Sequence, residues 1–236
     1  MLNMTLNEIY ETLLKTYSRQ GWWPVINYNG TNPTKTGSVN GYHPGDYSFP
    51  RNESEKYEII IGAVLAQNTS WPQVEKSLKN LQKTVGITPK ELLTADEEEI
   101  KKAIKPSGYF NQKYRYLLNI TRFYQSLDNE TPERKELLNV KGIGPETADS
   151  ILLYAYKEKE FVIDAYTRRI FSYLGIIDEK DNYNKIKKVF EDNFTGNVND
   201  YQEYHALIVE HAKNHYSKKA YGVNDNILNR YIIQKV

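Results

Sequence analysis

Residues 59–65 (Ile-Ile-Ile-Gly-Ala-Val-Leu) carry only apolar side chains and one glycine, and this run constrains the fold more than any other part of the chain. A helix that is apolar on every face is stable only when other elements cover it on all sides. A buried strand would also suit the run, but no neighbouring segment has the alternation of a strand that would extend a sheet. We therefore predict a buried helix at the centre of an all-α protein.

Apolar residues recur at helical spacing along most of the remaining chain, beginning with Leu6, Ile9 and Leu13. Residues 27–54 interrupt the pattern, because they are rich in Asn, Gly, Pro, Ser and Thr without any period. Such a long loop is usually functional or mobile. We expect about ten helices and no β-hairpin. Eight of them are expected over residues 6–17, 57–65, 74–85, 117–127, 145–157, 165–174, 183–194 and 200–216, and two more are expected to start at the capping residues Thr88 and Thr94.

The composition excludes several classes of protein. The chain has no cysteine, which excludes disulfides, thiolate zinc sites, cysteine nucleophiles and Cys-ligated iron–sulfur clusters. His211 and His215 are four residues apart and share a helix face, but no nearby Asp or Glu completes a known ligand spacing, so we predict no metal site there. No apolar run is long enough to cross a membrane, and the first residues lack signal-peptide features. We expect a soluble cytoplasmic protein.

The charge balance argues against a uniformly basic coat that would bind nucleic acid. The chain has 31 Lys and Arg residues against 30 Asp and Glu residues, for a net charge of +1. A local basic face remains compatible with this balance, because affinity for phosphate depends on where the charges lie.

The clearest chemical pattern is Lys141-Gly142-Ile143-Gly144-Pro145, where one short helix ends and another begins. Two glycines allow a tight turn that exposes main-chain N–H groups beside a helix N-terminus, an arrangement that binds phosphate. Lys141 adds a cation. An ordinary pair of antiparallel helices also favours Gly and Pro in its turn, and the spacing alone does not separate the two interpretations.

Asp164 stands about 20 residues after this turn, directly behind the apolar run Phe161-Val162-Ile163. It is well placed to cap the helix that starts at Ala165. A carboxylate at this position is equally well placed to face a substrate bound at the turn, and both roles stay open.

These two segments together, Val-Lys-Gly-Ile-Gly-Pro-Glu-Thr-Ala and Phe-Val-Ile-Asp-Ala-Tyr-Thr-Arg-Arg, resemble the helix-hairpin-helix DNA glycosylase superfamily, the relatives of endonuclease III. Residues 62–69 resemble the family helix and loop whose Gln, here Gln67, penetrates the DNA stack. Residues 106–113 resemble its Gly-x-x-Asn-x-Lys segment, and residues 205–209 resemble its closing helix. The resemblance covers roughly residues 5–216.

The resemblance implies two helical lobes flanking a DNA-binding cleft. Residues 55–158 would form a barrel-like lobe ending in the helix-hairpin-helix at 137–156, residues 1–26 plus 159–236 would form the discontinuous lobe, and 27–54 would be a loop insertion. It also implies a monomer that binds double-stranded DNA with a damaged base and associates with the nucleoid. The implied DNA contacts are Gln67, Asn68, Lys113, Lys141, Gly142, Ile143, Gly144 and Thr147.

The sequence departs from endonuclease III at two points. Bifunctional relatives carry a Schiff-base lysine where this chain has Glu146, and a carboxylate cannot form an imine, so we expect no lyase activity. Relatives often bind an iron–sulfur cluster near the C-terminus, but residues 213–222 hold no thiol, so we expect no such cluster. The family also places a monovalent cation at the hairpin, which would fall on the main-chain carbonyls of Leu138, Val140 and Ile143.

Cleavage of an N-glycosidic bond passes through a cationic sugar, which a carboxylate stabilises, and Asp164 is the candidate. Trp22 and Trp23 resemble the base pocket of the 3-methyladenine glycosylase branch and suit a cationic, flipped-out base, although both would also suit packing at the lobe interface. Tyr47, Phe49 and Glu146 complete the predicted pocket. His205 is interpreted as a core residue.

We therefore expect a monofunctional DNA glycosylase for alkylated purines. One alternative is a glycosylase for uracil, hypoxanthine or an oxidised base. The other is a non-catalytic DNA-binding protein, and Asp164 argues against it, because a carboxylate near phosphates repels them.

Overall fold

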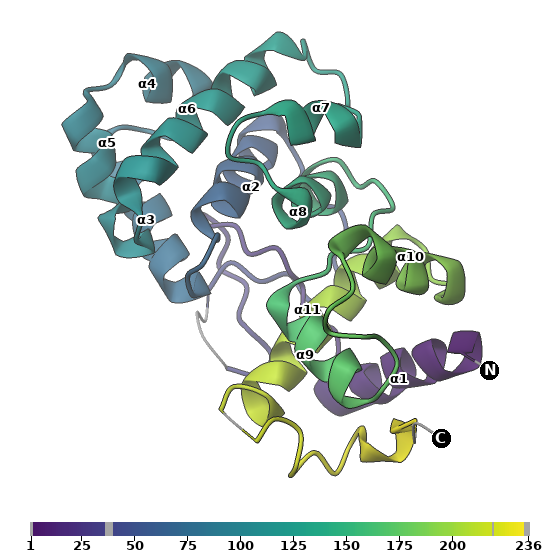
Figure 1. Ribbon diagram of the computed structural model, residues 1–236. Coiled ribbons are helices and arrows are strands. Elements are labelled where there is room, and N and C mark those ends of the chain that lie inside the picture. Colours follow the sequence, from purple (N-terminus) through teal and green to yellow (C-terminus); the bar gives the residue numbers. More distant parts are fainter. Residues whose placement is uncertain (1, 36–39, 219, 234–236) are drawn as a thin grey trace.

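The apolar run forms the helix α2, Glu53–Leu65, at the centre of one lobe of the computed structural model (Figure 1). Its residues from Ile59 to Leu65 are all buried. The structure describes residues 2–35, 40–218 and 220–233, and across these ranges the regular elements are helices, with one isolated bridge between Thr31 and Asn40. The prediction of an all-α fold is confirmed.

The first lobe surrounds α2 with the helices that follow it in the chain. Helix α2 packs directly against α3, α6 and α8, which explains why it is apolar on all faces. The elements of this lobe are α3 (Trp71–Thr84), α4 (Pro89–Thr94), α5 (Glu97–Ile104), the 3-10 helix η1 (Lys105–Ser107), α6 (Phe110–Ser126), α7 (Arg134–Asn139) and α8 (Pro145–Ala155).

The second lobe joins the two ends of the chain, as Figure 1 shows by its purple and yellow-green helices. Helix α11 packs against α1 and α9, and α1 also packs against α10. The elements of this lobe are α1 (Leu2–Tyr17), α9 (Ala165–Tyr173), α10 (Tyr183–Asn193), α11 (Val198–His215) and the 3-10 helix η2 (Asn229–Tyr231). None of the described helices is long and apolar enough to cross a membrane.

Helices α1, α2 and α3 start three or four residues earlier than expected, and the starts of α5 and α6 also differ from the expectation. Thr94 is the last residue of α4, and the cap of α5 is Asp96, whose carboxylate accepts hydrogen bonds from the N–H groups of Glu98 and Glu99. Asp is a strong N-cap, and the acidic residues that follow Asp96 favour the first turn of a helix, so α5 begins after Asp96 and not after Thr94. Helix α6 begins at Phe110, earlier than residue 117, because Gly108 and Tyr109 turn the chain there with positive φ.

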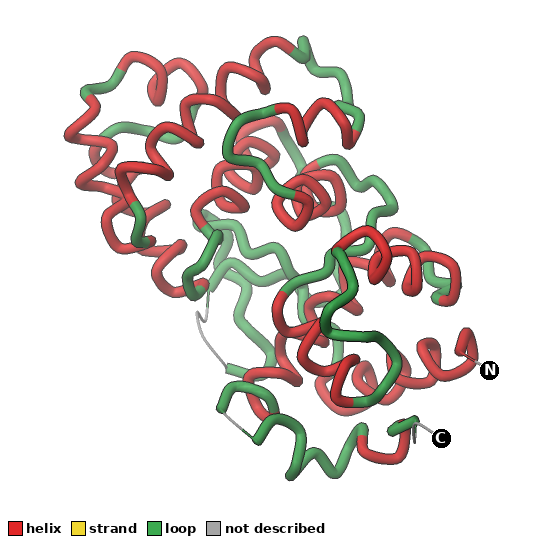
Figure 2. The backbone as a smooth tube through the Cα atoms, viewed as in Figure 1, coloured by secondary structure: helices red, strands yellow, loops and turns green. Residues whose placement is uncertain are grey.

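The long segment between α1 and α2 is held by main-chain hydrogen bonds and passes between the two groups of helices (Figure 2). The N–H of Val25 donates to Gly41 at 3.0 Å, and the N–H of His43 donates to Gly21 at 3.1 Å. The His43 imidazole also contacts the carbonyl of Trp23 at 2.9 Å. The loop is therefore built around Trp23. Residues 36–39 of the predicted loop lie outside the described residues.

A buried ion cluster joins the lobes. The fully buried carboxylate of Asp149 on α8 lies 2.6 Å from Nε of Arg134 and 3.1 Å from Nζ of Lys187 on α10. Lys187 also pairs with Glu160. Because a buried carboxylate without partners would be costly, this cluster fixes α8 against α10.

Candidate active site and DNA interface

The turn between α7 and α8 exposes a helix N-terminus to solvent. Gly144 is the N-cap of α8, Pro145 follows it, and no described side chain caps this end. The first turn of α8 therefore keeps main-chain N–H groups available for an anion, and the helix dipole favours a negative charge there. This is the arrangement that the sequence predicts for phosphate binding.

The two glycines of the turn serve different purposes. Gly142 has φ of +104°, and a Cβ there would lie 2.1 Å from the Tyr116 ring, so its role is structural. A Cβ at Gly144 would meet nothing within 4 Å, so this position faces open space that a DNA backbone can approach. Lys141 is exposed next to them, and its carbonyl accepts a hydrogen bond from Asn119 at 3.0 Å. Ile143 is buried beneath the turn and anchors it.

Gln67 ties the loop after α2 to this turn. Its amide nitrogen lies 3.0 Å from both the Gly142 carbonyl and the Thr147 hydroxyl, to which it donates. Asn68, the next residue, is exposed and has positive φ. The structure thus brings the two predicted DNA-contacting segments together, and in the free protein Asn68 is the side chain that extends outward from them.

The structure buries the side chains of two predicted DNA contacts. Lys113 is buried, and its ammonium donates to the carbonyls of Leu65 and Ser107 at 2.7 Å each. Burial lowers its pKa to about 8. Lys113 therefore stabilises the C-terminal end of α2 rather than touching a phosphate. The Thr147 side chain is also buried and is occupied by Gln67.

Asp164 is the N-cap of α9, and its carboxylate faces His205 of α11. Its Oδ1 accepts hydrogen bonds from the N–H and hydroxyl of Thr167 at 2.7 and 2.8 Å. Its Oδ2 lies 3.7 Å from Nε2 of His205. Burial raises the pKa of Asp164, but His205 and Thr167 outweigh it and hold the pKa below its ordinary value. The carboxylate is therefore charged at neutral pH, as stabilisation of a cation requires.

His205, interpreted from the sequence as a core residue, is the neighbour that the sequence does not reveal. Its Nδ1 lies 2.7 Å from the Tyr154 hydroxyl, which also lies 3.1 Å from the carbonyl of Gln202. When Nδ1 accepts the hydroxyl proton on the shorter contact, the ring carries its own proton on Nε2, which faces Asp164. No pattern around residue 205 indicates this contact, since it arises from the docking of α11 against α9.

Glu146 stands on the first turn of α8, where the residue keeps some contact with solvent while protein atoms surround its carboxyl group. This burial of the carboxyl raises its pKa, the charge on Asp164 raises it further, and Arg168 lowers it, with the result that the pKa is about 7. Of these two interacting carboxyl groups, Asp164 has a lowered pKa and Glu146 a raised one. This division suits acid–base chemistry.

The aromatic residues form a cluster beside this site. Trp22 and Trp71 lie edge-on at 4.8 Å between ring centroids, and Trp23 lies 5.3 Å from Trp71 and 5.4 Å from Tyr154. Tyr154 in turn contacts His205, which connects the cluster to Asp164. Gly62 of α2 makes room for Trp23, since a Cβ there would lie 3.3 Å from the indole nitrogen.

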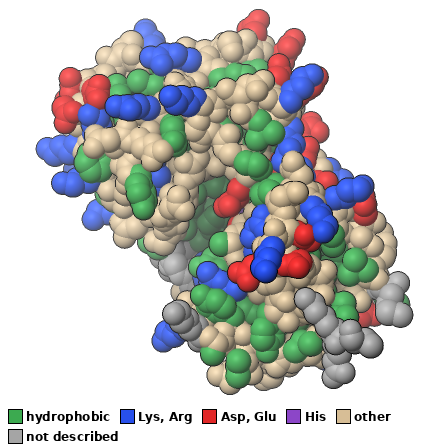
Figure 3. All heavy atoms as spheres, viewed as in Figure 1, with side chains coloured by type: hydrophobic (Ala, Val, Ile, Leu, Met, Phe, Trp, Pro, Cys, Tyr) green, Lys and Arg blue, Asp and Glu red, His purple; other side chains and the backbone are tan. Residues whose placement is uncertain are grey.

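The cluster holds three unused hydrogen-bond donors. The indole N–H groups of Trp22, Trp23 and Trp71 are buried, and no acceptor for them exists among the described residues. Buried donors are normally paired, so these suit a ligand with acceptor atoms. Trp22 is half-buried while Trp23 is 5% exposed, so Trp22 is the better placed to stack on a base. In Figure 3, hydrophobic side chains line a recess between the lobes.

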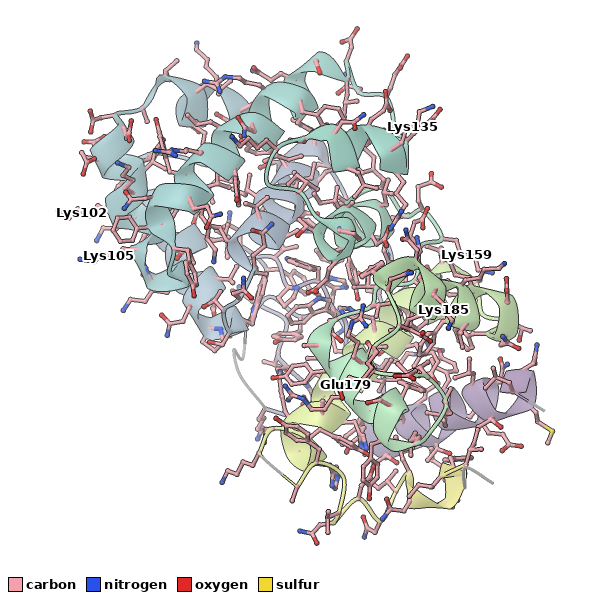
Figure 4. The ribbon with its side chains drawn as sticks, in the orientation of Figure 1. Lys102, Lys105, Lys135, Lys159, Glu179 and Lys185 are labelled. Carbon is pink, nitrogen blue, oxygen red and sulfur yellow. The ribbon has the colours of Figure 1, made fainter. Side chains whose placement is uncertain are left out.

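Two predicted pocket residues are held by partners outside the aromatic cluster. Phe49 is buried within the loop and stacks on His43 at 4.1 Å between ring centroids. The Tyr47 hydroxyl donates to the buried Glu203 of α11 at 2.8 Å and accepts a hydrogen bond from Arg19. Lys102 and Lys105 lie at the edge of the first lobe, away from the recess (Figure 4).

The comparisons with known proteins agree with this geometry. The family model described as HhH-GPD superfamily base excision DNA repair protein matches residues 61–195. The chain is 39% identical over 224 residues to the putative DNA repair glycosylase MJ1434 of Methanocaldococcus jannaschii, covering 90% of this chain and 89% of that protein.

Two solved structures share the fold. The H. pylori 3-methyladenine DNA glycosylase bound to 1,N6-ethenoadenine has a TM-score of 0.65 at 24% identity, covering 90% of this chain and 97% of that one. A non-covalent endonuclease III–DNA complex has a TM-score of 0.71 at 16% identity, covering 92% and 88%. With the family model spanning more than half of the chain, the protein belongs to the HhH-GPD superfamily of base excision DNA repair proteins and is a DNA glycosylase of that superfamily.

Proposed function

We propose that this glycosylase is monofunctional and removes alkylated purines from double-stranded DNA, with Asp164 as the catalytic residue. The observation that carries the proposal is the pairing of a charged Asp164 with a neighbouring carboxyl, Glu146, where bifunctional relatives hold a lysine. A carboxyl group cannot form the imine on which lyase activity depends.

The chemical step follows from the charges at the site. As the bond between the base nitrogen and C1′ breaks, its electron pair leaves with the base and the sugar becomes cationic. The ionised Asp164 stabilises that cation, and water then adds to C1′ and loses a proton to the solvent or to a carboxylate. His205 is a positioning residue, because its Nε2 faces Oδ2 of Asp164 and orients that carboxylate.

The aromatic cluster supports an alkylated purine as the substrate. A base alkylated on a ring nitrogen is cationic and leaves without a general acid, and it gains from the electron-rich faces of Trp22 and its neighbours. The flipped base would enter the recess between the lobes while the hairpin holds the backbone through the N–H groups around Gly144. A monovalent cation at the carbonyls of Leu138, Val140 and Ile143 stays a prediction.

A neutral base is the second candidate, and Glu146 favours it. With a pKa of about 7, this carboxyl is able to give a proton to a departing neutral base, which a cationic base does not need. The unpaired indole N–H groups would also serve acceptors on such a base.

The deciding experiment is a panel of duplexes, each with one lesion, assayed for base release with and without alkali. We expect release of N-alkylated purines at the highest kcat/KM and strand cleavage only after alkali. Cleavage without alkali, or an adduct trapped by borohydride, would overturn the monofunctional assignment. A preference for uracil, hypoxanthine or an oxidised base would overturn the proposal that alkylated purines are the substrate.

Variants of Trp22 sharpen the result. Trp22→Phe keeps a stacking face and Trp22→Leu removes it, so the leucine variant should lose roughly tenfold more kcat/KM on a charged lesion. Equal losses in the two variants would place Trp22 in packing alone.

A further inference from the structure

Two histidines and one aspartate from separate parts of the chain converge at the end of α11. His211 and His215 lie one turn apart on α11, and Asp225 belongs to the segment that follows it. One potential ligand atom from each lies within 4.8 Å of the other two. His211 and Asp225 are fully buried, whereas His215 is half-buried and leaves a path from solvent.

Each member has partners outside the trio, and Oδ2 of Asp225 also accepts a hydrogen bond from the Tyr216 hydroxyl at 2.9 Å. Nδ1 of His211 lies 3.0 Å from the Tyr17 hydroxyl, which is able to accept a proton from it. The His215 ring is held by the main chain of Asn224. Oδ1 of Asp225 accepts the N–H groups of residues 227 and 228 at 3.0 Å each. Metal-binding histidines commonly donate their second nitrogen to such partners, which orients the first.

The remaining atoms point toward one another. Nε2 of His211 lies 2.8 Å from Oδ2 of Asp225, and the His211 and His215 rings are 4.6 Å apart between centroids. Ligand atoms on a tetrahedral zinc ion lie roughly 3.4 Å apart. A metal would therefore separate His211 from Asp225 by a few tenths of an ångström and draw His215 inward by a rotation of its partly exposed side chain.

We propose that His211, His215 and Asp225 bind one divalent transition-metal ion of the zinc type. Two imidazoles and one carboxylate form a donor set that such ions accept, and they leave one position for water. The site is structural, because it lies six residues beyond His205, about 9 Å further along the axis of α11 than the residue that faces Asp164. The metal fastens the segment carrying Asp225 to α11, and through Tyr17 to α1.

The test is metal binding by the full, tag-free chain after removal of metals with a chelator. The protein is dialysed against Zn²⁺ and its metal content is measured, and Co²⁺ is titrated while the visible absorption of a tetrahedral complex is followed. We expect one ion per chain. We also expect Zn²⁺ to raise the melting temperature and to protect the segment after α11 from proteolysis.

His215→Gln is the principal variant, because it removes one ligand and keeps the hydrogen bond between His211 and Asp225. It should bind the metal at least tenfold more weakly and lose the rise in melting temperature. Asp225→Asn should do the same, and Asp192→Asn, at an exposed site on α10, is the matched control that should bind like the unaltered chain.

Two results overturn the proposal. A chain that binds no Zn²⁺ or Co²⁺ would leave only a hydrogen-bonded His–Asp pair at this place. Binding that is equally strong in His215→Gln would locate the metal elsewhere. If Asp225→Asn fails to fold, His215→Gln still decides between these outcomes.

Discussion

The helices α8 and α9 both begin at the candidate site, but their N-termini are used in opposite ways. The N-terminus of α8 has only Gly144 and Pro145, and no described side chain caps it. The N-terminus of α9 is capped by Asp164, which binds both the N–H and the hydroxyl of Thr167. Both helix N-termini attract a negative charge, but the anions that they bind differ. One is open, and we propose that it binds a phosphate of DNA, while the other is filled by the carboxylate proposed to act on the sugar.

The comparison teaches that the role of a helix N-terminus is set by what satisfies its N–H groups. When a carboxylate of the chain itself accepts hydrogen bonds from these N–H groups, they are no longer available to an external anion, and the hydrogen bonds help to lower the pKa of that carboxylate. An uncapped end gives up some helix stability and remains a binding site.

The largest effect should follow from neutralising the anion on α9. Asp164→Asn keeps an oxygen that caps the helix but removes the charge that stabilises the sugar cation. We expect base excision to fall at least about a hundredfold while affinity for lesion-containing DNA is unchanged or tighter. Single-turnover excision and equilibrium binding measure the two quantities. Wild-type turnover in this variant would remove Asp164 from the catalytic role.

A smaller effect should follow from giving α8 the cap that α9 has. In Gly144→Asp the new carboxylate would occupy the N–H groups and repel phosphate, so DNA affinity should fall about tenfold for all sequences. Gly144→Ala is the matched control, and it should bind within about twofold of the unaltered chain, because a Cβ there meets nothing within 4 Å. A loss confined to one lesion would contradict a backbone contact.

The smallest effect should follow from the charge interaction between Glu146, on the first turn of α8, and Asp164, the N-cap of α9. Its pKa is raised to about 7 in the folded chain from an ordinary value of 4.5, so the folded state holds the proton over a range where the unfolded state has released it. The difference in stability from Glu146→Gln is therefore constant at low pH, and the unaltered chain loses stability relative to this variant as pH rises from 4.5 to 7. Melting temperatures across this range measure the difference.

A second variant tests the direction in which Asp164 shifts the pKa of Glu146. Because the charge on Asp164 helps to raise the pKa of Glu146, Asp164→Asn should lower it. If the pH dependence that Glu146 contributes is the same in Asp164→Asn as in the unaltered chain, the two carboxyls do not interact.

The sequence predicts those features that depend on neighbours along the chain. The buried α2 follows from its apolar run, the capping of α9 by Asp164 follows from local preference, and the turn at Gly142 follows from its two glycines. The resemblance alone predicts a DNA contact for Lys113, and only the packing of α6 against α2 shows that its ammonium is buried against the carbonyl of Leu65.

Contacts between residues that are far apart in the sequence cannot be predicted from local patterns, for a physical reason. His205 meets Asp164, and Asp225 meets His211, because whole helices and segments dock, and no periodicity reports such docking. No acidic residue near His211 and His215 in the sequence completes a known ligand spacing, because their acidic partner, Asp225, lies in the segment after the helix.

The packing of α1 against α11 bears on the order in which the protein assembles during synthesis. The Tyr204 hydroxyl donates to the carbonyl of Leu6 at 3.0 Å, and the Tyr10 and Tyr204 rings lie 5.3 Å apart. Helix α1 therefore packs against a helix that is made much later than itself, while α2 to α8 form a continuous unit that is able to fold in between. Since α11 also carries His205, Asp164 gains this partner only after α11 has been made. A partly made chain that has already folded the turn at Gly144 therefore lacks the assembled site that we propose cuts a base from DNA.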